Sequence, residues 1–396
     1  MNRHLLLFSL VLALGPSVTR ADTPITVGER IDLPSKVMGE ERRLYVSLPA
    51  SYARTKQSYP VLYMTDGEAQ FLHTLATTAF LARNGVMPEV IVVAVGNTDR
   101  TRDLSPSHDP TIATSGGADH FLDFFEKELI PFVETRYRTV PFRIFAGHSL
   151  GGLFAFHSMR ARPGLFQAVI AVSPWLVYDN RKELALLAPF LASDAVKTRA
   201  LFYTSGDEGK EMSEVVASVT KALKARKDRS LRFASATYPA ENHGSVVLLS
   251  HYAALRMIFD GWAMPVDPAT ERLVGTLSEV KKRYGELSER LGYRVPPPEA
   301  TVNLLGYQSL AQKNLPAALA LFRFNVETYP ESANVYDSLG DALEANGSLE
   351  EALSNAKKAA EIGGKNDDPN LKFFKEHAER LKAKLAAPAG ENPARR

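Results

Sequence analysis

The feature that most constrains the fold is a regular alternation of short apolar runs with longer amphipathic runs between residues 42 and 262. The short runs have strand length and are rich in Val, Ile and Phe, and the longer runs repeat apolar residues at helical spacing. Strands are expected at residues 42–49, 59–67, 89–97, 142–147, 166–174, 199–207 and 231–239, and helices at 71–85, 119–137, 153–163, 213–226 and 246–262. Strands joined through helices lie parallel in one sheet covered on both faces. The pattern predicts an α/β fold with a mostly parallel central sheet, in which function is found at the carboxyl ends of the strands.

One expected strand end carries a nucleophile motif. The strand at residues 142–147 runs into AGHSLGG, in which Gly147, Ser149 and Gly151 follow the pattern G-x-S-x-G. In α/β-hydrolases this pattern turns the chain so sharply from strand to helix that the serine hydroxyl stands exposed above the sheet. We therefore expect an α/β-hydrolase fold with Ser149 as the nucleophile. The adjacent His148 is expected to point elsewhere on such a turn and to pack beside the site.

Two later strand ends carry the partners that a serine nucleophile needs. The segment TSGDEG places Asp207 and Glu208 after one strand, and ENHGS places His243 after the next. The order serine, acid, histidine is that of the α/β-hydrolase triad. Either carboxylate can orient the imidazole and stabilise the imidazolium, and Glu211 is a weaker third candidate. His243 is preferred over the two histidines further downstream because it alone lies in a loop at a strand end.

An oxyanion hole is expected from two backbone N–H groups. One belongs to Leu150, directly after the nucleophile. The second is expected in the earlier strand-end loop MTDGEAQF, at Gly67 or Glu68, although these residues also fit a simple turn. The expected reaction is attack of the serine on an ester carbonyl and hydrolysis of the acyl-enzyme by water, with the histidine as base in both steps. No cofactor and no metal are predicted.

The N-terminus has the pattern of a secretory signal. Arg3 and His4 precede an apolar core from Leu5 to Leu14, which is followed by small residues up to Ala21. The core is too short to span a bilayer, which takes about 20 residues. We expect cleavage near Ala21, export to the periplasm and no integral membrane segment after the signal is removed. The lack of cysteine excludes disulfides and thiolate catalysis, and a net charge of +2 without a basic stripe excludes nucleic-acid binding.

Several segments make residues 25–262 similar to one esterase family. They are PVLYMTDGEAQF, VGNTDRTRDLSP, AGHSLGG, AVSPWL, SGDEGKEM and ENHGSV. They resemble the esterase family of α/β-hydrolases that contains esterase D, feruloyl esterase modules, bacterial mycolyltransferases and the enterochelin and trilactone-siderophore esterases. NTDRTRDLSP and GDEGKEM resemble the siderophore-esterase branch most closely, where the acid is often a glutamate a few residues before a methionine. The resemblance favours Glu208 over Asp207 and implies ester substrates, siderophore lactones among them.

Four residues are candidates for the substrate pocket. Arg100 and Arg102 lie in the segment NTDRTRDLSP and could bind an anionic or catecholate substrate, or could form internal ion pairs with Asp103 that hold the loop. Trp175 follows an expected strand and could line an aromatic pocket or pack in the core. His148 is the fourth candidate because it neighbours the nucleophile.

The last third of the chain is predicted to be a small all-α region. Gly306 and Gly340 are 34 residues apart, as are Ala318 and Ala352, and 34 is the tetratricopeptide period. Two repeats and a final helix are fewer than such arrays usually need, so we expect them to dock on the catalytic domain or on a second copy of the chain. The region resembles the tetratricopeptide tail of some siderophore esterases. Its expected role is packing that stabilises the enzyme or shapes the pocket mouth, with partner binding as the alternative.

The predicted organisation has five segments: a signal peptide (1–21), an esterase domain (22–265), a helical linker (266–295), tetratricopeptide-like repeats (296–385) and a disordered tail (386–396). The predicted function is hydrolysis of small-molecule or lipid-like carboxylic esters by an exported serine hydrolase. Acyl transfer to an alcohol through the same acyl-enzyme is an alternative. A second alternative is a catalytically weak scaffold whose repeats bind a partner protein or form a homodimer.

Overall fold

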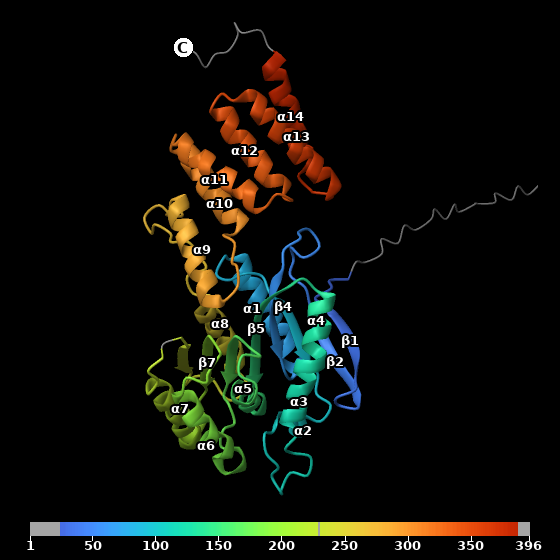
Figure 1. Cartoon of the computed structure of the whole chain (residues 1–396), viewed down its shortest axis with the longest axis vertical. Coiled ribbons are helices and arrows are strands. Elements are labelled where there is room, and N and C mark those ends of the chain that lie inside the picture. Colours follow the sequence, from blue (N-terminus) through green and yellow to red (C-terminus); the bar gives the residue numbers. More distant parts are fainter. Residues whose placement is uncertain (1–23, 229, 387–396) are drawn as a thin grey trace, which may run out of the picture.

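The computed structural model describes residues 24–228 and 230–386, which form an α/β part and a helical part (Figure 1). The expected signal peptide and residues 387–396 of the expected tail lie outside the described residues. Within the described ranges, no helix is long and apolar enough to cross a membrane.

The α/β part is built on one sheet with the strand order β1-β2-β4-β3-β5-β6-β7-β8. The strands are β1 (Glu29–Ser35), β2 (Glu40–Ser47), β3 (Tyr59–Met64), β4 (Ile91–Val95), β5 (Thr139–His148), β6 (Ala168–Val172), β7 (Ala200–Ser205) and β8 (Arg232–Thr237). All neighbours from β4 to β8 are parallel, whereas β2 is antiparallel to both β1 and β4. The predicted α/β-hydrolase fold with a mostly parallel sheet is confirmed, and β1 is a strand that the sequence analysis missed.

Helices cover both faces of the sheet because successive strand side chains point to opposite faces. In β3, Val61 and Tyr63 belong to the hydrophobic core on one face, and Leu62 and Met64 to the core on the other. The first face carries α2 (Arg100–Leu104), α3 (Ala118–Phe124), α4 (Ile130–Arg136), α5 (Leu150–Ala161), α6 (Tyr178–Ala192) and α7 (Gly209–Lys224). The second face carries α1 (Gly67–Arg83) and α8 (Val246–Ile258). Helix α6 was not expected from the sequence.

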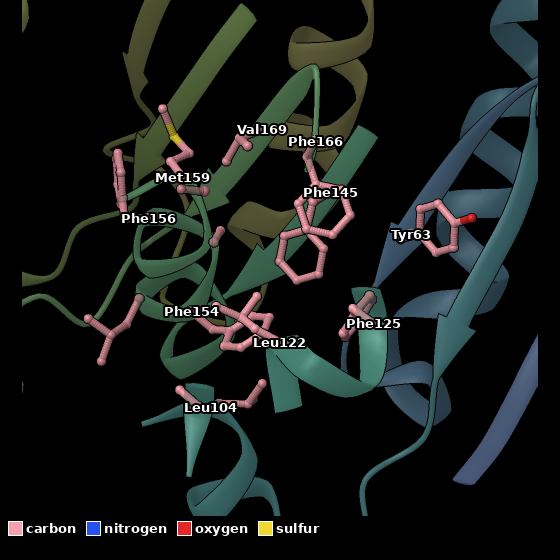
Figure 2. Close-up of a cluster of buried hydrophobic side chains, with 14 of the residues drawn as sticks. Tyr63, Leu104, Leu122, Phe125, Phe145, Phe154, Phe156, Met159, Phe166 and Val169 are labelled. Atoms are coloured by element: carbon pink, nitrogen blue, oxygen red, sulfur yellow. The ribbon is translucent and has the colours of Figure 1, made fainter. Parts of the chain in front are cut away.

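Phenylalanine rings form the centre of the first core (Figure 2). The ring of Phe145 on β5 lies 5.7 Å from Phe125, 5.5 Å from Phe154 on α5 and 4.9 Å from Phe166. Phe125 begins a π-helical turn, η1 (Phe125–Leu129), which separates α3 from α4, so the long helix expected at 119–137 is not regular. Burial of each such ring contributes roughly 1.5–3 kcal/mol. The cluster therefore holds α5, the helix that follows Ser149, firmly on the sheet.

Helix α9 (Leu277–Leu291) lies in the segment predicted to be a linker, but its apolar side belongs to the second core. Val280, Tyr284 and Leu291 are buried in the same cluster as Phe142 and Phe259 of the α/β part. If this segment were only a spacer, these apolar side chains would be exposed to water. Removing apolar surface from water is favourable by roughly 25 cal/mol per Å², so the packed arrangement is the more stable one. The segment is helical, as predicted, and its helix packs into the core of the α/β part.

Contacts at the strand starts show where the helical part is attached. Arg199, directly before β7, donates hydrogen bonds to the carbonyl oxygens of Glu289 (3.3 Å) and Arg290 (3.4 Å). The ring of Tyr293 lies 5.7 Å from that of Phe142, near the start of β5. Parallel strands begin at one edge of the sheet and end at the other, so these contacts place α9 at the edge opposite to the end of β5, which leads into Ser149. These contacts disagree with one part of the expected packing role, in which the repeats shape the pocket mouth.

Beyond α9, the helices recur in pairs. They are α10 (Glu299–Ala311) with α11 (Leu315–Thr328), α12 (Ala333–Ala345) with α13 (Leu349–Lys365), and a final α14 (Leu371–Ala386). The starts of α10 and α12 differ by 333 − 299 = 34 residues and those of α11 and α13 by 349 − 315 = 34, which fits the expected repeats. Val302, Leu305 and Leu321 of the first pair are buried in the second core, so the repeats dock on the α/β part through α9.

Candidate active site

Ser149 occupies a strained turn between β5 and α5. Its backbone has φ 61° and ψ −116°, a combination that costs a non-glycine residue about 1–3 kcal/mol. Two backbone hydrogen bonds hold it there: the Ser149 N–H donates to Val172 O (2.9 Å), and the Trp175 N–H donates to Ser149 O (3.0 Å). Strain maintained by surrounding contacts is a feature of functional sites, and this turn has the form expected of a nucleophile motif.

The glycines of the motif are required by close contacts. A Cβ on Gly147 would lie 2.0 Å from the carbonyl oxygen of Gly151, and a Cβ on Gly151 would lie 2.6 Å from Oγ1 of Thr65. A Cβ on Gly152 would lie 2.9 Å from the carbonyl oxygen of Val172. The contact between Gly147 and Gly151 lies within the turn, so a larger side chain at Gly147 would prevent the turn from forming. The contact between Gly151 and Thr65 brings the loop after β3 against the first turn of α5.

Glu208 and His243 lie together at the carboxyl edge of the sheet. Nδ1 of His243 is 3.2 Å from Oε2 of Glu208, whose side chain is only 7% exposed. The other oxygen, Oε1, accepts hydrogen bonds from the hydroxyl of Ser173 and from the N–H of Gly206 (3.0 Å). Burial by itself would raise the pKa of Glu208, but the contacts with His243, Ser173 and Gly206 outweigh it and lower the pKa to about 2. Glu208 is therefore a carboxylate that can orient the imidazole throughout the neutral pH range.

The other two acid candidates point elsewhere. Asp207 is exposed, and its backbone N–H donates to the carbonyl oxygen of Glu241 (2.8 Å). Glu211 forms an ion pair with Arg181 at 3.4 Å. Among the contacts of the described residues, His243 pairs with neither of them. Of the three candidates, Glu208 is the carboxylate that lies against His243, and it is the one that the family resemblance favoured.

His148 supports the loop that carries His243. Its Nε2–H donates a 2.7 Å hydrogen bond to the backbone carbonyl oxygen of His243, and the two rings lie 4.6 Å apart. Burial and the neighbouring His243 lower the pKa of His148, so that ring stays neutral. Among the described residues, no hydrogen bond joins the Ser149 hydroxyl to the imidazole of His243. Such a bond is still compatible with catalysis, because catalytic hydrogen bonds commonly tighten only when substrate binds.

The expected oxyanion donors lie at two helix starts. Leu150 is the first residue of α5, and Gly67 and Glu68 are the first two residues of α1. The first N–H groups of a helix have no acceptor in their own helix, so these groups can bind an oxyanion. The close approach of Thr65 to Gly151 places the two helix starts side by side.

The two pocket arginines are held in ion pairs. Nε of Arg100 lies 2.6 Å from Oδ1 of Asp66, and its Nη2 donates to the carbonyl oxygen of His148 (3.3 Å). Arg102 pairs with Glu40 (2.5 Å) and with Asp103 (2.8 Å). The internal ion-pair alternative with Asp103 fits Arg102, which joins Asp103 and Glu40 in a part-buried network. Arg100 is also paired internally, but with Asp66, and its bond to His148 braces the Ser149 turn.

Trp175 is the pocket candidate that is accessible and not engaged in an ion pair. The residue is 37% exposed, and its indole lies 5.5 Å from the ring of Tyr178. Its backbone N–H donates the hydrogen bond to Ser149 O described above. Ser173, two residues earlier, is a site residue that the sequence analysis missed. It follows β6 at the same sheet edge as the triad candidates, so its position at a strand end was the signal that could have identified it.

Comparison with known proteins agrees with this geometry. The family model described as Putative esterase matches residues 35–248. The chain is 33% identical over 169 residues to a siderophore enterobactin esterase of Emericella nidulans, covering 36% of this chain and 55% of the relative. It is 31% identical over 159 residues to the ferri-bacillibactin esterase BesA of Bacillus subtilis, covering 35% and 54%. The chain thus matches about half the length of these curated relatives.

Two solved structures resemble larger parts of the chain. An IroE-like serine hydrolase from Shewanella oneidensis is 30% identical, with a TM-score of 0.68 over 76% of this chain and 99% of the other. An uncharacterised protein from Capnocytophaga ochracea is 17% identical, with a TM-score of 0.58 over 90% and 99%, and it shares the fold. The match of the family model to more than half of the chain, on the sheet that carries Ser149, shows that this protein belongs to the esterase family of α/β-hydrolases.

Proposed function

We propose that this protein hydrolyses carboxylic esters with Ser149 as nucleophile, His243 as general base and acid, and Glu208 as the group that orients the imidazole. The observation that carries the proposal is the strained Ser149 turn at the same sheet edge as the Glu208–His243 pair. A strained serine without a base would remain a weak nucleophile, and a base without a serine would have no proton to accept.

The proposed reaction has two steps. In the first, Oγ of Ser149 attacks the ester carbonyl carbon and its proton passes to Nε2 of His243, while the carbonyl oxygen becomes an oxyanion bound by the N–H groups of Leu150 and of Gly67 or Glu68. The tetrahedral adduct then collapses, and the alcohol leaves with the proton from the imidazolium. In the second step water attacks the acyl-enzyme, gives its proton to the same imidazole and releases the acid and the free serine.

Siderophore lactone esters are the proposed substrate class. Relatives of this chain are described as siderophore enterobactin and ferri-bacillibactin esterases. The exposed indole of Trp175 beside the nucleophile offers an apolar surface to an aromatic acyl or alcohol group. The arginines are in ion pairs, so we assign substrate contact to Trp175 and bracing of the turn to Arg100.

Export and a packing role for the repeats belong to the same proposal. The order of charged, apolar and small residues in 1–21 supports export to the periplasm, and the mature protein would then begin near residue 22. Val302, Leu305 and Leu321 are buried in the same core as the apolar side of α9, which supports a role for the repeats in stabilising the α/β part. Cell fractionation with mass spectrometry of the mature N-terminus tests the first point; an intact residue 1 in the cytosolic fraction would contradict it.

The catalytic proposal is tested with a short-chain aryl ester, a trilactone siderophore and a feruloyl ester. Ser149→Ala should lower turnover by at least about 1000-fold, whereas Ser213→Ala, at an exposed serine of α7, should leave it unchanged. A fluorophosphonate should add one adduct, mapped to Ser149 by peptide mass spectrometry. Full turnover by folded Ser149→Ala, or an adduct on another serine, would refute the assignment.

A further inference from the structure

A cluster of ionisable side chains lies between α12 and α14, far from the catalytic residues. Asp337, Asp341 and Glu344 follow one another at helical spacing i, i+4 and i+7 on one side of α12. His377 of α14 faces them, and its side chain is only 7% exposed. A buried imidazole among three carboxylates is costly unless each of its nitrogens has a partner.

Among the described residues, His377 has a hydrogen-bond partner on only one of its two ring nitrogens. Nδ1 lies 2.7 Å from Oδ1 of Asp337, and donation of the Nδ1–H to this carboxylate leaves the lone pair of the neutral ring on Nε2. Nε2 is buried and has no hydrogen-bond partner among the described residues. It lies 3.5 Å from Oδ1 of Asp341 and 3.7 Å from Oε2 of Glu344. The unpartnered nitrogen therefore faces two carboxylate oxygens across a small gap.

The outer oxygens of both carboxylates are held by other side chains. Oδ2 of Asp341 accepts a 2.8 Å hydrogen bond from the hydroxyl of Tyr307. Oε1 of Glu344 accepts hydrogen bonds from Arg380 (2.6 Å) and from Lys384. Each carboxylate is thus oriented so that its inner oxygen faces Nε2 of His377. Groups that fix ligands in this way are the usual second layer of a metal site.

We propose that this cluster binds one divalent metal ion of the Zn²⁺ type through Nε2 of His377, Oδ1 of Asp341 and Oε2 of Glu344. Tetrahedral bonds of about 2.1 Å place neighbouring ligand atoms about 3.4 Å apart. The two separations from Nε2 are 3.5 and 3.7 Å, and the three residues each offer a ligand atom within 4.8 Å of the other two. Small side-chain shifts would complete the geometry, with water as the fourth ligand. Asp337, on the other nitrogen of the ring, completes a carboxylate–histidine–metal arrangement.

The ligand set distinguishes among metals. One imidazole nitrogen and two carboxylate oxygens suit Zn²⁺, whereas Ca²⁺ takes six to eight oxygen ligands and Mg²⁺ prefers an octahedral shell of oxygens. Two ionised carboxylates and a neutral imidazole balance the charge of a divalent ion. The bound metal would join α14 to α12 and so fasten the last helix to the repeats. The competing occupant of the gap is a proton on Nε2, held as an imidazolium by the three carboxylates.

The test uses the full chain without an affinity tag, dialysed against EDTA and then against metal-free buffer. Calorimetric titration with Zn²⁺ should give one site per chain, and Co²⁺ should give the strong visible absorption of a four-coordinate ion. Asp341→Asn and Glu344→Gln, which keep side-chain volume, should abolish that site. Asp337→Asn should weaken Zn²⁺ binding by about 10- to 100-fold, as expected for a group that only orients a ligand. His120→Gln, at an exposed histidine, is the matched control and should bind like the wild type.

The outcomes separate the two occupants of the gap. One site that both carboxylate variants lose, together with a melting temperature that rises with Zn²⁺ in the wild type only, supports the metal. Failure of the folded wild type to bind Zn²⁺, or undiminished binding by Asp341→Asn, overturns the proposal in favour of the imidazolium. Circular dichroism shows whether each variant keeps its helices. None of these measurements depends on ester hydrolysis, so the metal site and the proposed catalytic function can fail separately.

Discussion

Glu208→Gln removes one negative charge beside His243 and leaves the volume of the side chain almost unchanged. The contacts of Glu208 stabilise its ionised form, because its pKa is about 2 and not the usual 4.5. The difference, 4.5 − 2 = 2.5 units, corresponds to at most about 3 to 4 kcal/mol at 1.36 kcal/mol per unit, and the contacts with His243, Ser173 and Gly206 share it. Only the share of this stabilisation that comes from His243 acts on the imidazolium of the transition state, so its loss would slow turnover by up to roughly 300-fold. A wrong imidazole tautomer would extend the loss to about 10⁴-fold.

The assay is steady-state hydrolysis of an aryl ester at neutral pH by wild-type protein, Glu208→Gln and Asp207→Asn. We expect kcat to fall about 100- to 10⁴-fold for Glu208→Gln and by less than about threefold for Asp207→Asn, whose side chain is exposed. Circular dichroism and thermal melts check that both variants are folded. A larger loss for Asp207→Asn, or near wild-type kcat for Glu208→Gln, would refute the assignment of the acid.

Four further predictions concern stability and substrate binding. Because the pKa of Glu208 is lower in the folded state, its carboxylate stabilises the fold above about pH 4.5 and loses this effect as the pH falls toward about 2; urea unfolding of Glu208→Gln should depend less on pH across that range. Gly151→Ala places a methyl group against a threonine hydroxyl and should lower the unfolding free energy by about 1–3 kcal/mol, measured in urea. Trp175→Ala should raise KM for aryl esters more than it lowers kcat, since the backbone bond to the nucleophile remains; equal KM would exclude the indole from the pocket. Leu291→Ala, in the buried side of α9, should cost about 2–5 kcal/mol, and the exposed control Leu304→Ala less than about 0.5.

Some site residues could be predicted from the sequence because their geometry depends on neighbouring residues, and others could not because it depends on contacts between distant parts of the chain. Ser149 could be located because its turn is made by glycines two residues before and two residues after it, and the required contact from Gly147 to Gly151 is local. The acid could not be chosen from the residues alone, because Asp207 and Glu208 are adjacent and differ only in which one the fold turns inward. Ser173 lies 35 residues from Glu208 along the chain, so nothing local indicated their hydrogen bond.

The helical part shows the same division. The 34-residue period predicted the paired helices, because each repeat has its own helical spacing of apolar residues. The sequence did not predict that α9 would be part of the core. The spacing of apolar residues in an amphipathic helix shows that one face is buried, but it does not show which other element that face packs against.

The sequence by itself determined the α/β alternation, the nucleophile turn, the order of the catalytic candidates and the helical repeat, since each depends on spacing within one element or on the order of elements along the chain. Only the tertiary structure decided that Glu208 faces His243, that Arg100 is paired with Asp66, that the repeats attach at the edge opposite to Ser149 and that His377 faces Asp341. These contacts join residues about 30 to 90 positions apart. Which residues meet in these contacts depends on how the helices pack on the sheet and on one another. Because the interior is close-packed, that arrangement depends on all the buried side chains together.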